Sequence, residues 1–219
     1  MFPPRFAPIL QEMEPLAALF REAGHRLFLV GGSVRDLLLG DTDAGTDLDL
    51  IDFDATTTAT PDQIKKIVQP IADALWTQGE RFGTIGLKIG ERTYEITTHR
   101  AEAYSPDSRK PEVQFATDIE TDLSRRDFTI NAMALELTTD TPVLVDPFGG
   151  LADLMARVLR TPLSAEESFN DDPLRMLRAA RFISQLEVAP DPSITAAVTA
   201  MADRLTIVSA ERVRIEFDR

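Results

Sequence analysis

The spacing of apolar residues near the N-terminus predicts a helix, a strand and a second, shorter helix. Over residues 7–24 the apolar side chains recur every three or four positions, which is the period of one helix face. Residues 26–32 read RLFLVGG, an apolar run that ends in two glycines and predicts a strand entering a tight turn. Ser33 can cap a short helix over 34–39, and Gly40 is suited to end it.

The next part of the chain combines strand periodicity with one more helical stretch. Residues 47–52, DLDLID, alternate polar and apolar side chains and predict a strand. Residues 60–76 open with a threonine cap and a proline, which predicts a helix that bends at Pro70. A β-hairpin is expected over 84–98, with its turn near Gly90.

From residue 99 onwards the pattern changes from mixed to helical. Residues 99–112 carry two prolines, several charges and no period, so we interpret them as an exposed loop. A helix is expected at about 127–136 and a strand at 143–146. Further helical stretches are expected at 150–156, 165–186, 192–204 and 209–217. The pattern therefore predicts an α+β part, a boundary near 160–164 and an all-helical segment after it.

Composition narrows the class of protein. The chain has 219 residues, 43% of them hydrophobic, which suffices for a sizeable core, and no apolar run is as long as a membrane span. The N-terminus has no signal-peptide pattern, so we expect a cytoplasmic location and no membrane partner. Because the chain contains no cysteine, a disulfide framework and a thiolate zinc site are excluded, and zinc is not expected. A metal would be held by carboxylates, which favour Mg²⁺, Mn²⁺ or Ca²⁺.

The charge of the chain limits how it can bind nucleic acid. A formal net charge of −13 argues against a surface that binds nucleic acid over its whole area, because phosphate binding depends on clustered Lys and Arg. Arginines nevertheless gather at 125–126 and at 175–181. A local cationic groove on an acidic protein is compatible with this distribution.

The stretch from Gly31 to Asp49 combines two features that nucleotidyl transfer requires. Gly31 and Gly32 allow a ligand to approach the backbone, and the helix after them presents unpaired N–H groups to an anion, to which Arg35 can add a guanidinium. Asp47 and Asp49 are two apart, so on a strand both carboxylates project to one side and can hold a divalent cation. Alone, the glycines can be a simple turn and D-x-D a simple strand end. Together, at this spacing, they favour phosphoryl or nucleotidyl transfer.

Two later segments leave their roles open. Glu95, on a predicted strand, can supply a third carboxylate to the same metals or face solvent. Arg125 and Arg126 precede Asp127 at the start of a predicted helix, where they can neutralise phosphates or form a solvated face.

The segment 171–186 has an informative pattern of charge. Three arginines repeat every third position along this predicted helix: Arg175, Arg178 and Arg181. The apolar side roughly opposite them comprises Met176, Leu177, Ala180 and Ile183. Three arginines so placed repel one another unless an anion faces them. The acidic residues at the start of the helix also suit its dipole, which is the structural alternative for Asp171 and Asp172.

Asp172 and Arg175, one turn apart, can act jointly on a nucleobase. A carboxylate accepts a hydrogen bond from an exocyclic amine, while a guanidinium donates one to the neighbouring ring nitrogen. Cytosine and adenine carry that pair of groups on their Watson–Crick edges. Uracil and guanine direct a carbonyl at the carboxylate instead, which costs about 1–3 kcal/mol or more. The two side chains can therefore select C and A without a template.

Four ordered motifs carry a resemblance to a known family. LVGGSVRDLLLG with the following DLD, RRDFTINAMA, VDPFGGLADL and DDPLRMLRAARF resemble the class II tRNA nucleotidyltransferases (CCA-adding enzymes) and the related bacterial poly(A) polymerases of the DNA polymerase β superfamily. The resemblance covers about 26–217. It implies a nucleotidyltransferase head with a five-stranded mixed sheet and flanking helices, followed by an all-helical neck. The expected divisions are an N-terminal helix over 1–25, a head over 26–160 and the start of the neck over 161–219, with the C-terminal body and tail absent.

The resemblance also implies roles for individual residues. Asp47 and Asp49 would be the catalytic Mg²⁺ ligands. The expected nucleotide-binding residues are Gly32, Arg35, Arg126, Asp172, Arg175, Arg178 and Arg181. Among these, Asp172 and Arg175 would read the base, and Arg126 is favoured over Arg125. The loop at 99–111 matches the flexible loop that helps the family's site change from CTP to ATP.

The leading hypothesis is a Mg²⁺-dependent, template-independent nucleotidyltransferase that adds CCA to tRNA 3′ ends from CTP and ATP with release of pyrophosphate. Its partners would be CTP, ATP and a tRNA 3′ end, the last bound weakly by this fragment. One alternative is a poly(A) polymerase that uses ATP alone. Another is a nucleotide-binding fragment with little activity until its missing RNA-binding domains are present. An aminoglycoside-type nucleotidyltransferase is a third hypothesis, which RRDFTINAMA and the arginine-rich helix do not support.

Overall fold

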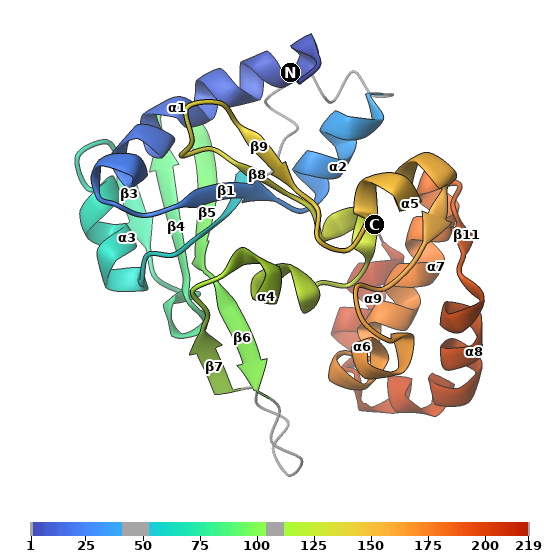
Figure 1. The fold of residues 1–219 in the computed structure, drawn as a ribbon. Coiled ribbons are helices and arrows are strands. Elements are labelled where there is room, and N and C mark those ends of the chain that lie inside the picture. Colours follow the sequence, from blue (N-terminus) through green and yellow to red (C-terminus); the bar gives the residue numbers. More distant parts are fainter. Residues whose placement is uncertain (1, 41–52, 104–111, 219) are drawn as a thin grey trace. The chain divides into compact units, whose positions relative to one another are not determined.

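The computed structural model describes residues 2–40, 53–103 and 112–218, and its contacts divide the chain into two compact units (Figure 1). The first unit comprises Met1–Leu123 and Met133–Pro147, and the second comprises Ser124–Ala132 and Phe148–Arg219. The division between head and neck at 160/161 stays a prediction. The two units divide the chain differently, because residues 124–132 and 148–160 belong to the unit of the C-terminal helices.

The first unit is built on a mixed β-sheet, which has seven strands in the described part of the chain. The strands are β1 (Leu27–Val30), β2 (Phe53–Thr57), β3 (Ala74–Trp76), β4 (Thr84–Ile89), β5 (Arg92–Thr98), β8 (Ala134–Glu136) and β9 (Val143–Val145). Their order is β3-β4-β5-β2-β1-β8-β9; β2 and β5 are parallel, and the other neighbouring pairs are antiparallel. The predicted α+β class is confirmed, whereas the predicted number of five strands is too low.

The strand predicted at 47–52 lies outside the described residues, and β2 begins directly after it. Two further strands lie where the sequence pattern predicted helix. The helix expected over 60–76 is α3 (Pro61–Val68), which ends before Pro70 because a proline has no N–H to continue it. Its last predicted turn is β3 instead, paired with β4. The helix expected at 127–136 is a single 3₁₀ turn, η5 (Thr129–Asn131), followed by β8, which pairs with β1. In both cases sheet pairing prevails over the local period.

Two helices cover one face of the sheet. α1 (Ala7–Glu22) and α3 pack against each other and against this face. The Tyr94 hydroxyl on β5 donates a hydrogen bond to Glu12 on α1, and Ile64 on α3 and Ile96 on β5 are fully buried. On the opposite face of β2 and β5, Thr56 is buried, whereas Asp54, Thr93 and Glu95 are exposed. The helices therefore bury one face and leave these three polar side chains accessible.

The segment interpreted as a loop at 99–112 is more regular than expected. Residues at its two ends form a two-stranded antiparallel ribbon, β6 (Arg100–Ala103) and β7 (Glu112–Phe115). The short helix α4 (Ile119–Ser124) follows the ribbon, and all of it but Ser124 belongs to the first unit. The loop prediction is wrong for the strand residues, whose backbone groups pair across the ribbon. Residues 104–111 lie outside the described part of the chain.

The second unit is mainly helical. Its helices are α5 (Gly150–Ala156), α6 (Ala165–Asp171), α7 (Leu174–Leu186), α8 (Pro192–Met201), the 3₁₀ helix η6 (Ala202–Ile207) and α9 (Ala210–Phe217). The single helix expected over 165–186 is interrupted at Pro173, where Asp172 is extended. A short parallel pair, β10 (Val158–Leu159) and β11 (Ala189–Pro190), corrects the all-helical expectation.

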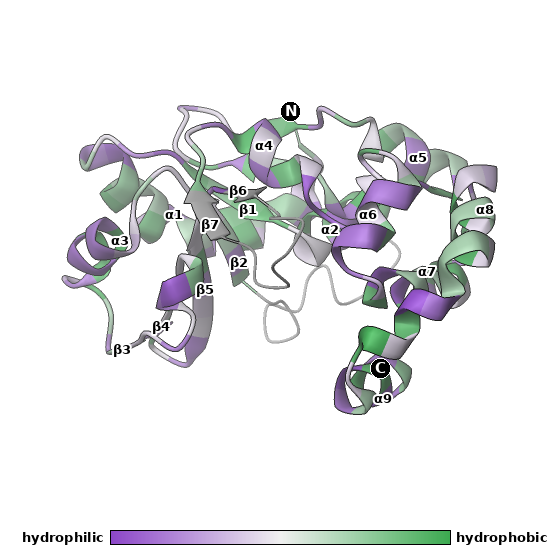
Figure 2. Cartoon of the chain, turned by 90° about the horizontal axis from the view of Figure 1, so that it is seen from below, coloured by the Kyte–Doolittle hydropathy of each residue, from purple (hydrophilic) through white to green (hydrophobic). Residues whose placement is uncertain are grey.

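The helices differ in the hydropathy of their residues. Figure 2 shows hydrophilic residues gathered on α3 and apolar residues along α8. Among the described residues, no helix has both the length and the apolar character needed to cross a membrane.

Candidate active site

The phosphate cradle predicted from the sequence falls on the turn between β1 and α2 (Gly32–Leu39). Gly31 has φ 78° and ψ −144°, a conformation that residues with a Cβ rarely adopt, and α2 begins directly after it. The predicted cap at Ser33 is therefore wrong, since Gly31 takes the N-cap position. Gly40 ends the helix in the left-handed conformation, as predicted. Arg5 holds the same end by donating to the carbonyl oxygens of Leu37 and Leu38.

Arg35 lies against this turn. Its side chain is only 12% exposed, and it binds Asp36 through Nε to Oδ1 at 2.8 Å and Nη2 to Oδ2 at 3.0 Å. A Cβ placed on Gly32 would lie 3.4 Å from Arg35 Nη2, so the guanidinium passes beside the first residue of the helix. The helix N-terminus and a cation thus occupy one place, which suits an anion such as a triphosphate.

Replacing each of the two glycines by alanine is expected to affect stability differently. Gly31→Ala is expected to lower the free energy of unfolding by about 1–3 kcal/mol, because alanine is strained at this positive φ. Gly32→Ala is expected to change it by less than about 1 kcal/mol, since its Cβ meets only the end of a side chain and alanine suits a helix. Urea unfolding of both variants measures this, and equal losses would contradict the assignment of strain to Gly31.

The predicted metal ligands Asp47 and Asp49 lie outside the described residues. The structure does describe Asp54, which belongs to a second D-x-D pattern, Asp52-Phe53-Asp54. Asp54 is exposed on β2 and is the register partner of Glu95, also exposed, on the neighbouring parallel strand β5. Sequence reasoning missed Asp54, although the repetition of D-x-D five residues further on was visible.

The register of the sheet brings Asp54 to the glycine turn. Leu29 on β1 pairs with Ala55, so continuing the antiparallel register by one residue places Asp54 opposite Val30, directly before Gly31. Asp54 and Glu95 lie side by side on adjacent strands, which are about 4.8 Å apart. Two carboxylates at this spacing suit a hard divalent cation. Within the described ranges no group of three His, Cys, Asp or Glu side chains is arranged to hold a metal.

In the second unit, the residues of the RRD motif do not begin a helix. Asp127 is buried, and four donors hold its carboxylate. Oδ2 accepts from Nε (2.9 Å) and Nη2 (2.5 Å) of Arg178, and Oδ1 accepts from Asn131 Nδ2 (3.1 Å) and the Phe128 N–H (2.8 Å). Burial raises the pKa of Asp127, but the charge of Arg178 and these hydrogen bonds outweigh it, so the pKa lies below its ordinary value.

Asp172 and Arg175, which are predicted to read the base, lie in one turn between α6 and α7. The Arg175 N–H donates to the Asp172 carbonyl at 3.0 Å, so the two residues are fixed relative to each other by the backbone. The Arg175 guanidinium donates to Ser168 Oγ at 2.9 Å and to the carbonyl oxygen of Arg125. The structure thus joins the RRD motif to the Asp172–Arg175 turn, and half-buried Arg126 is adjacent to that contact in sequence.

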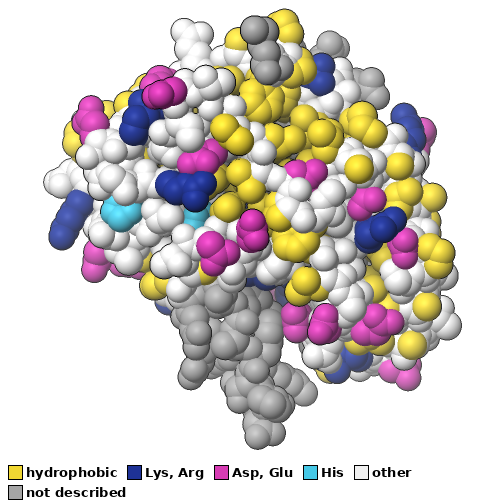
Figure 3. All heavy atoms as spheres, in the orientation of Figure 1, with side chains coloured by type: hydrophobic (Ala, Val, Ile, Leu, Met, Phe, Trp, Pro, Cys, Tyr) yellow, Lys and Arg dark blue, Asp and Glu magenta, His cyan; other side chains and the backbone are white. Residues whose placement is uncertain are grey.

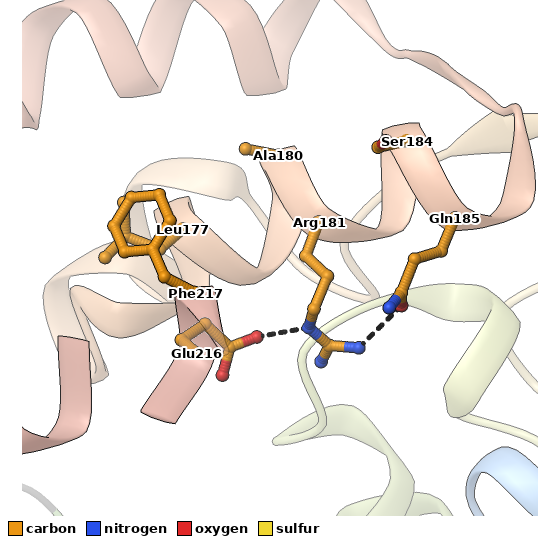
Figure 4. Close-up of a pocket in the computed structure, with 7 residues that line it drawn as sticks. All are labelled: Leu177, Ala180, Arg181, Ser184, Gln185, Glu216 and Phe217. Atoms are coloured by element: carbon orange, nitrogen blue, oxygen red, sulfur yellow. Dashed lines mark hydrogen bonds and ion pairs between the residues drawn. The ribbon is translucent and has the colours of Figure 1, made fainter. Parts of the chain in front are cut away.

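The other two arginines of α7 have carboxylate partners within the second unit. Arg178 binds Asp127, and Arg181 Nε donates to Glu216 Oε1 on α9 at 2.6 Å (Figure 4). These carboxylates are the anions that the spacing of the arginines required. The predicted apolar side is partly wrong: the buried residues of α7 are Leu174, Met176, Ala179 and Phe182, and Ala180 is exposed. Because both arginines already face anions, contact with a nucleotide at Arg178 and Arg181 stays a prediction.

Comparison with known proteins gives one matching family. A sequence model of the poly(A) polymerase head domain matches residues 27–160. The CCA-adding enzyme of Bacillus subtilis is 42% identical over 206 residues, which is 94% of this chain and 48% of that protein. The CCA-adding enzyme of Lactobacillus johnsonii is 38% identical over 211 residues, 96% of this chain and 48% of that protein. The chain therefore spans about half the length of these relatives.

Solved structures agree with the sequence comparison. The crystal structure of Bacillus stearothermophilus CCA-adding enzyme in complex with CTP is 32% identical with a TM-score of 0.80, covering 99% of this chain and 48% of that one. The Thermotoga maritima CCA-adding enzyme complexed with tRNA is 29% identical with a TM-score of 0.77, covering 95% of this chain and 46% of that one.

Proposed function

Because the chain belongs to the family of poly(A) polymerase head domains and CCA-adding enzymes, we propose that it is the nucleotide-handling part of a template-independent nucleotidyltransferase that adds CCA to tRNA 3′ ends. The observation that carries this proposal is the turn in which Asp172 and Arg175 are fixed one hydrogen bond apart. Such a pair can select cytosine and adenine by their Watson–Crick edges, with no template strand. The head and neck divisions at 26–160 and 161–219 belong to the same proposal.

The first unit supplies the residues that bind and orient the triphosphate. The amides that follow Gly31 and the Arg35 guanidinium would bind phosphate oxygens at the N-terminus of α2. Gly32 keeps the backbone open at the same place. How closely a phosphate can approach therefore depends on the residues of α2. Arg5 holds the C-terminal end of this helix through its hydrogen bonds to Leu37 and Leu38.

Carboxylates of the 47–54 stretch would hold Mg²⁺. The sequence proposes Asp47 and Asp49, and the register of β2 adds Asp54 with Glu95 beside it. Their donors are all carboxylate oxygens, which fit a hard divalent cation rather than zinc. Such an ion, when bound, lowers the pKa of an attacking hydroxyl and neutralises charge on the phosphates. The carboxylates would hold the ion, and among them Asp54 is opposite Val30 in the sheet register, directly before the glycine turn.

The second unit would supply the residues that recognise the base. Asp172 would accept from the exocyclic amine of C or A, and Arg175 would donate to the adjacent ring nitrogen. Arg126, Arg178 and Arg181 would add positive charge toward the phosphates. A uracil or guanine would direct a carbonyl oxygen at the Asp172 carboxylate in place of the amine, which costs about 1–3 kcal/mol.

Binding of the tRNA is expected to be weak in this chain. The net charge is −13, and on the face shown in Figure 3 the Lys and Arg side chains stand among Asp and Glu side chains. Phosphate-backbone binding needs clustered cations, so the longer relatives would draw much of their tRNA affinity from the half that this chain does not span.

The test is a gel assay with a tRNA transcript that lacks its CCA end. With Mg²⁺ we expect extension by CC with CTP alone and by CCA with CTP and ATP together. A long ladder with ATP alone would favour a poly(A) polymerase instead. No extension, together with Mg²⁺-dependent binding of CTP, would identify the chain as a nucleotide-binding fragment that needs further domains to place the RNA.

A further inference from the structure

The helix α9 contacts the base-reading turn through a residue outside the predicted site. Arg212 Nη2 donates to Asp172 Oδ2 at 3.0 Å, forming an ion pair. The other carboxylate oxygen, Oδ1, accepts the N–H of Leu174 at 3.2 Å. Each oxygen of Asp172 therefore has one donor, from the α7 backbone on one side and from α9 on the other. Two donors fix the plane of the carboxylate and leave each oxygen a further lone pair for a ligand.

The order of charges along α9 points to the same contact. A helix favours acidic residues in its first turn and basic residues in its last. Arg212 near the start and Glu216 near the end run against this preference, although the helix also carries charges that follow it. Their tertiary partners account for the reversal: Arg212 meets Asp172, and Glu216 meets Arg181 on α7 (Figure 4). α9 thus forms ion pairs at both ends of the segment from Asp172 to Arg181.

The exposure of Arg212 and Asp172 indicates that their ion pair contributes little to the stability of the second unit. The Arg212 side chain is 54% exposed and that of Asp172 is 31% exposed. Ion pairs of this exposure contribute little to stability, because water and salt screen them. Loss of the pair should therefore affect the orientation of Asp172 more than the stability of the protein.

Resting on the proposed function, we propose that Arg212 is a positioning residue that sets nucleotide selection by orienting Asp172. With Arg212 present, the carboxylate presents its lone pairs to the exocyclic amine of C or A. Without it, Oδ2 loses its partner and the side chain can rotate, so the penalty against a uracil carbonyl falls. Arg212 acts through Asp172 and does not itself contact the base.

The experiment measures equilibrium binding of CTP and UTP, with Mg²⁺, to the whole chain and its variants. Arg212→Ala is expected to lower the ratio of UTP to CTP dissociation constants by about tenfold, the size of loss found when the hydrogen-bond partner that orients a metal-ligating side chain is removed. Arg214→Ala is the matched control, because Arg214 lies on the same helix and pairs only with exposed Asp218 in the described contacts. It should leave the ratio unchanged.

A double-mutant cycle tests whether Arg212 acts through Asp172. In an Asp172→Ala background, Arg212→Ala should produce no further loss of selectivity. An additive loss, an unchanged ratio in the single variant, or tighter CTP binding by it would overturn the inference. If Arg212→Ala melts below the assay temperature, Arg212→Gln replaces it, with the same expected direction. Absence of CTP binding by the wild-type chain would instead overturn the proposed function itself.

Discussion

Replacing Asp54 by Asn is expected to lower nucleotide transfer by about a thousandfold or more, since Asp54 is proposed to hold the catalytic metal and such a ligand contributes several kcal/mol to the transition state. The register of β2 is the reason for choosing this residue. It places Asp54 next to Glu95 on β5 and opposite the end of β1, where the glycine turn begins. The substitution keeps the shape of the side chain and removes its charge. The gel assay with CTP and ATP measures the loss.

Parallel variants assign the metal ligands. The Asp47→Asn and Asp49→Asn double variant tests the pair proposed from sequence, and Glu95→Gln tests the neighbouring strand. Asp62→Asn is the matched control, because Asp62 is 78% exposed at the start of α3 and pairs with Lys65 on the surface. Full activity of Asp54→Asn, with activity abolished in the double variant, would return the assignment to Asp47 and Asp49. Activity that survives all three changes and removal of the metal would contradict carboxylate-held metal catalysis.

The elements that the sequence predicted well are those whose structure is decided locally. The N-terminal helix and the hairpin with its turn at Gly90 occur as α1, β4 and β5, because residues close in sequence carry their period and turn signals. The segments predicted wrongly are decided by distant partners. Residues 134–136 carry a helical pattern, yet they pair with β1, more than a hundred residues earlier in the chain. Such pairing leaves no local signal in the sequence.

The candidate site also contains one feature that local sequence predicts and others that depend on distant partners. The glycine turn was predictable because Gly-Gly before a short helix has a specific backbone meaning, which Gly31 bears out with its positive φ. The neighbour of Asp54 was not predictable, because the register of β2 against β5 depends on the whole sheet. Arg212 was missed for a similar reason, since forty residues separate it from Asp172 and only packing of α9 brings them together.

Replacing Asp127 by Asn is expected to lower the free energy of unfolding by about 3 kcal/mol at pH 7, because breaking a buried ion pair leaves the remaining charge without its partner. Asp127 is 8% exposed and accepts four hydrogen bonds, two of them from Arg178. An amide at this position would direct an NH₂ group at another donor, either Arg178 or Asn131. Arg178 is one-third exposed, which keeps the expected loss at the lower end of the range. Urea unfolding followed by circular dichroism measures it.

The pH dependence of this loss distinguishes the charge of Asp127 from its shape. The pKa of Asp127 lies below its ordinary value of 3.8, so the ionised carboxylate stabilises the folded state above that pH. The stabilisation is lost as the pH falls through the lowered pKa of the folded state. The difference between wild type and Asp127→Asn should therefore be constant from pH 7 to about pH 5 and shrink only below about pH 4.

An exposed ion pair of the same unit provides the control for this prediction. Asp218 pairs with Arg214, and the two side chains are 66% and 83% exposed, so Asp218→Asn should change the free energy of unfolding by less than about 0.5 kcal/mol. An equal loss in both variants would show that burial of Asp127 carries no special weight. A difference that grows on acidification would contradict the lowered pKa. A loss confined to Asp127→Asn would show that the buried ion pair between Asp127 and Arg178 stabilises the second unit.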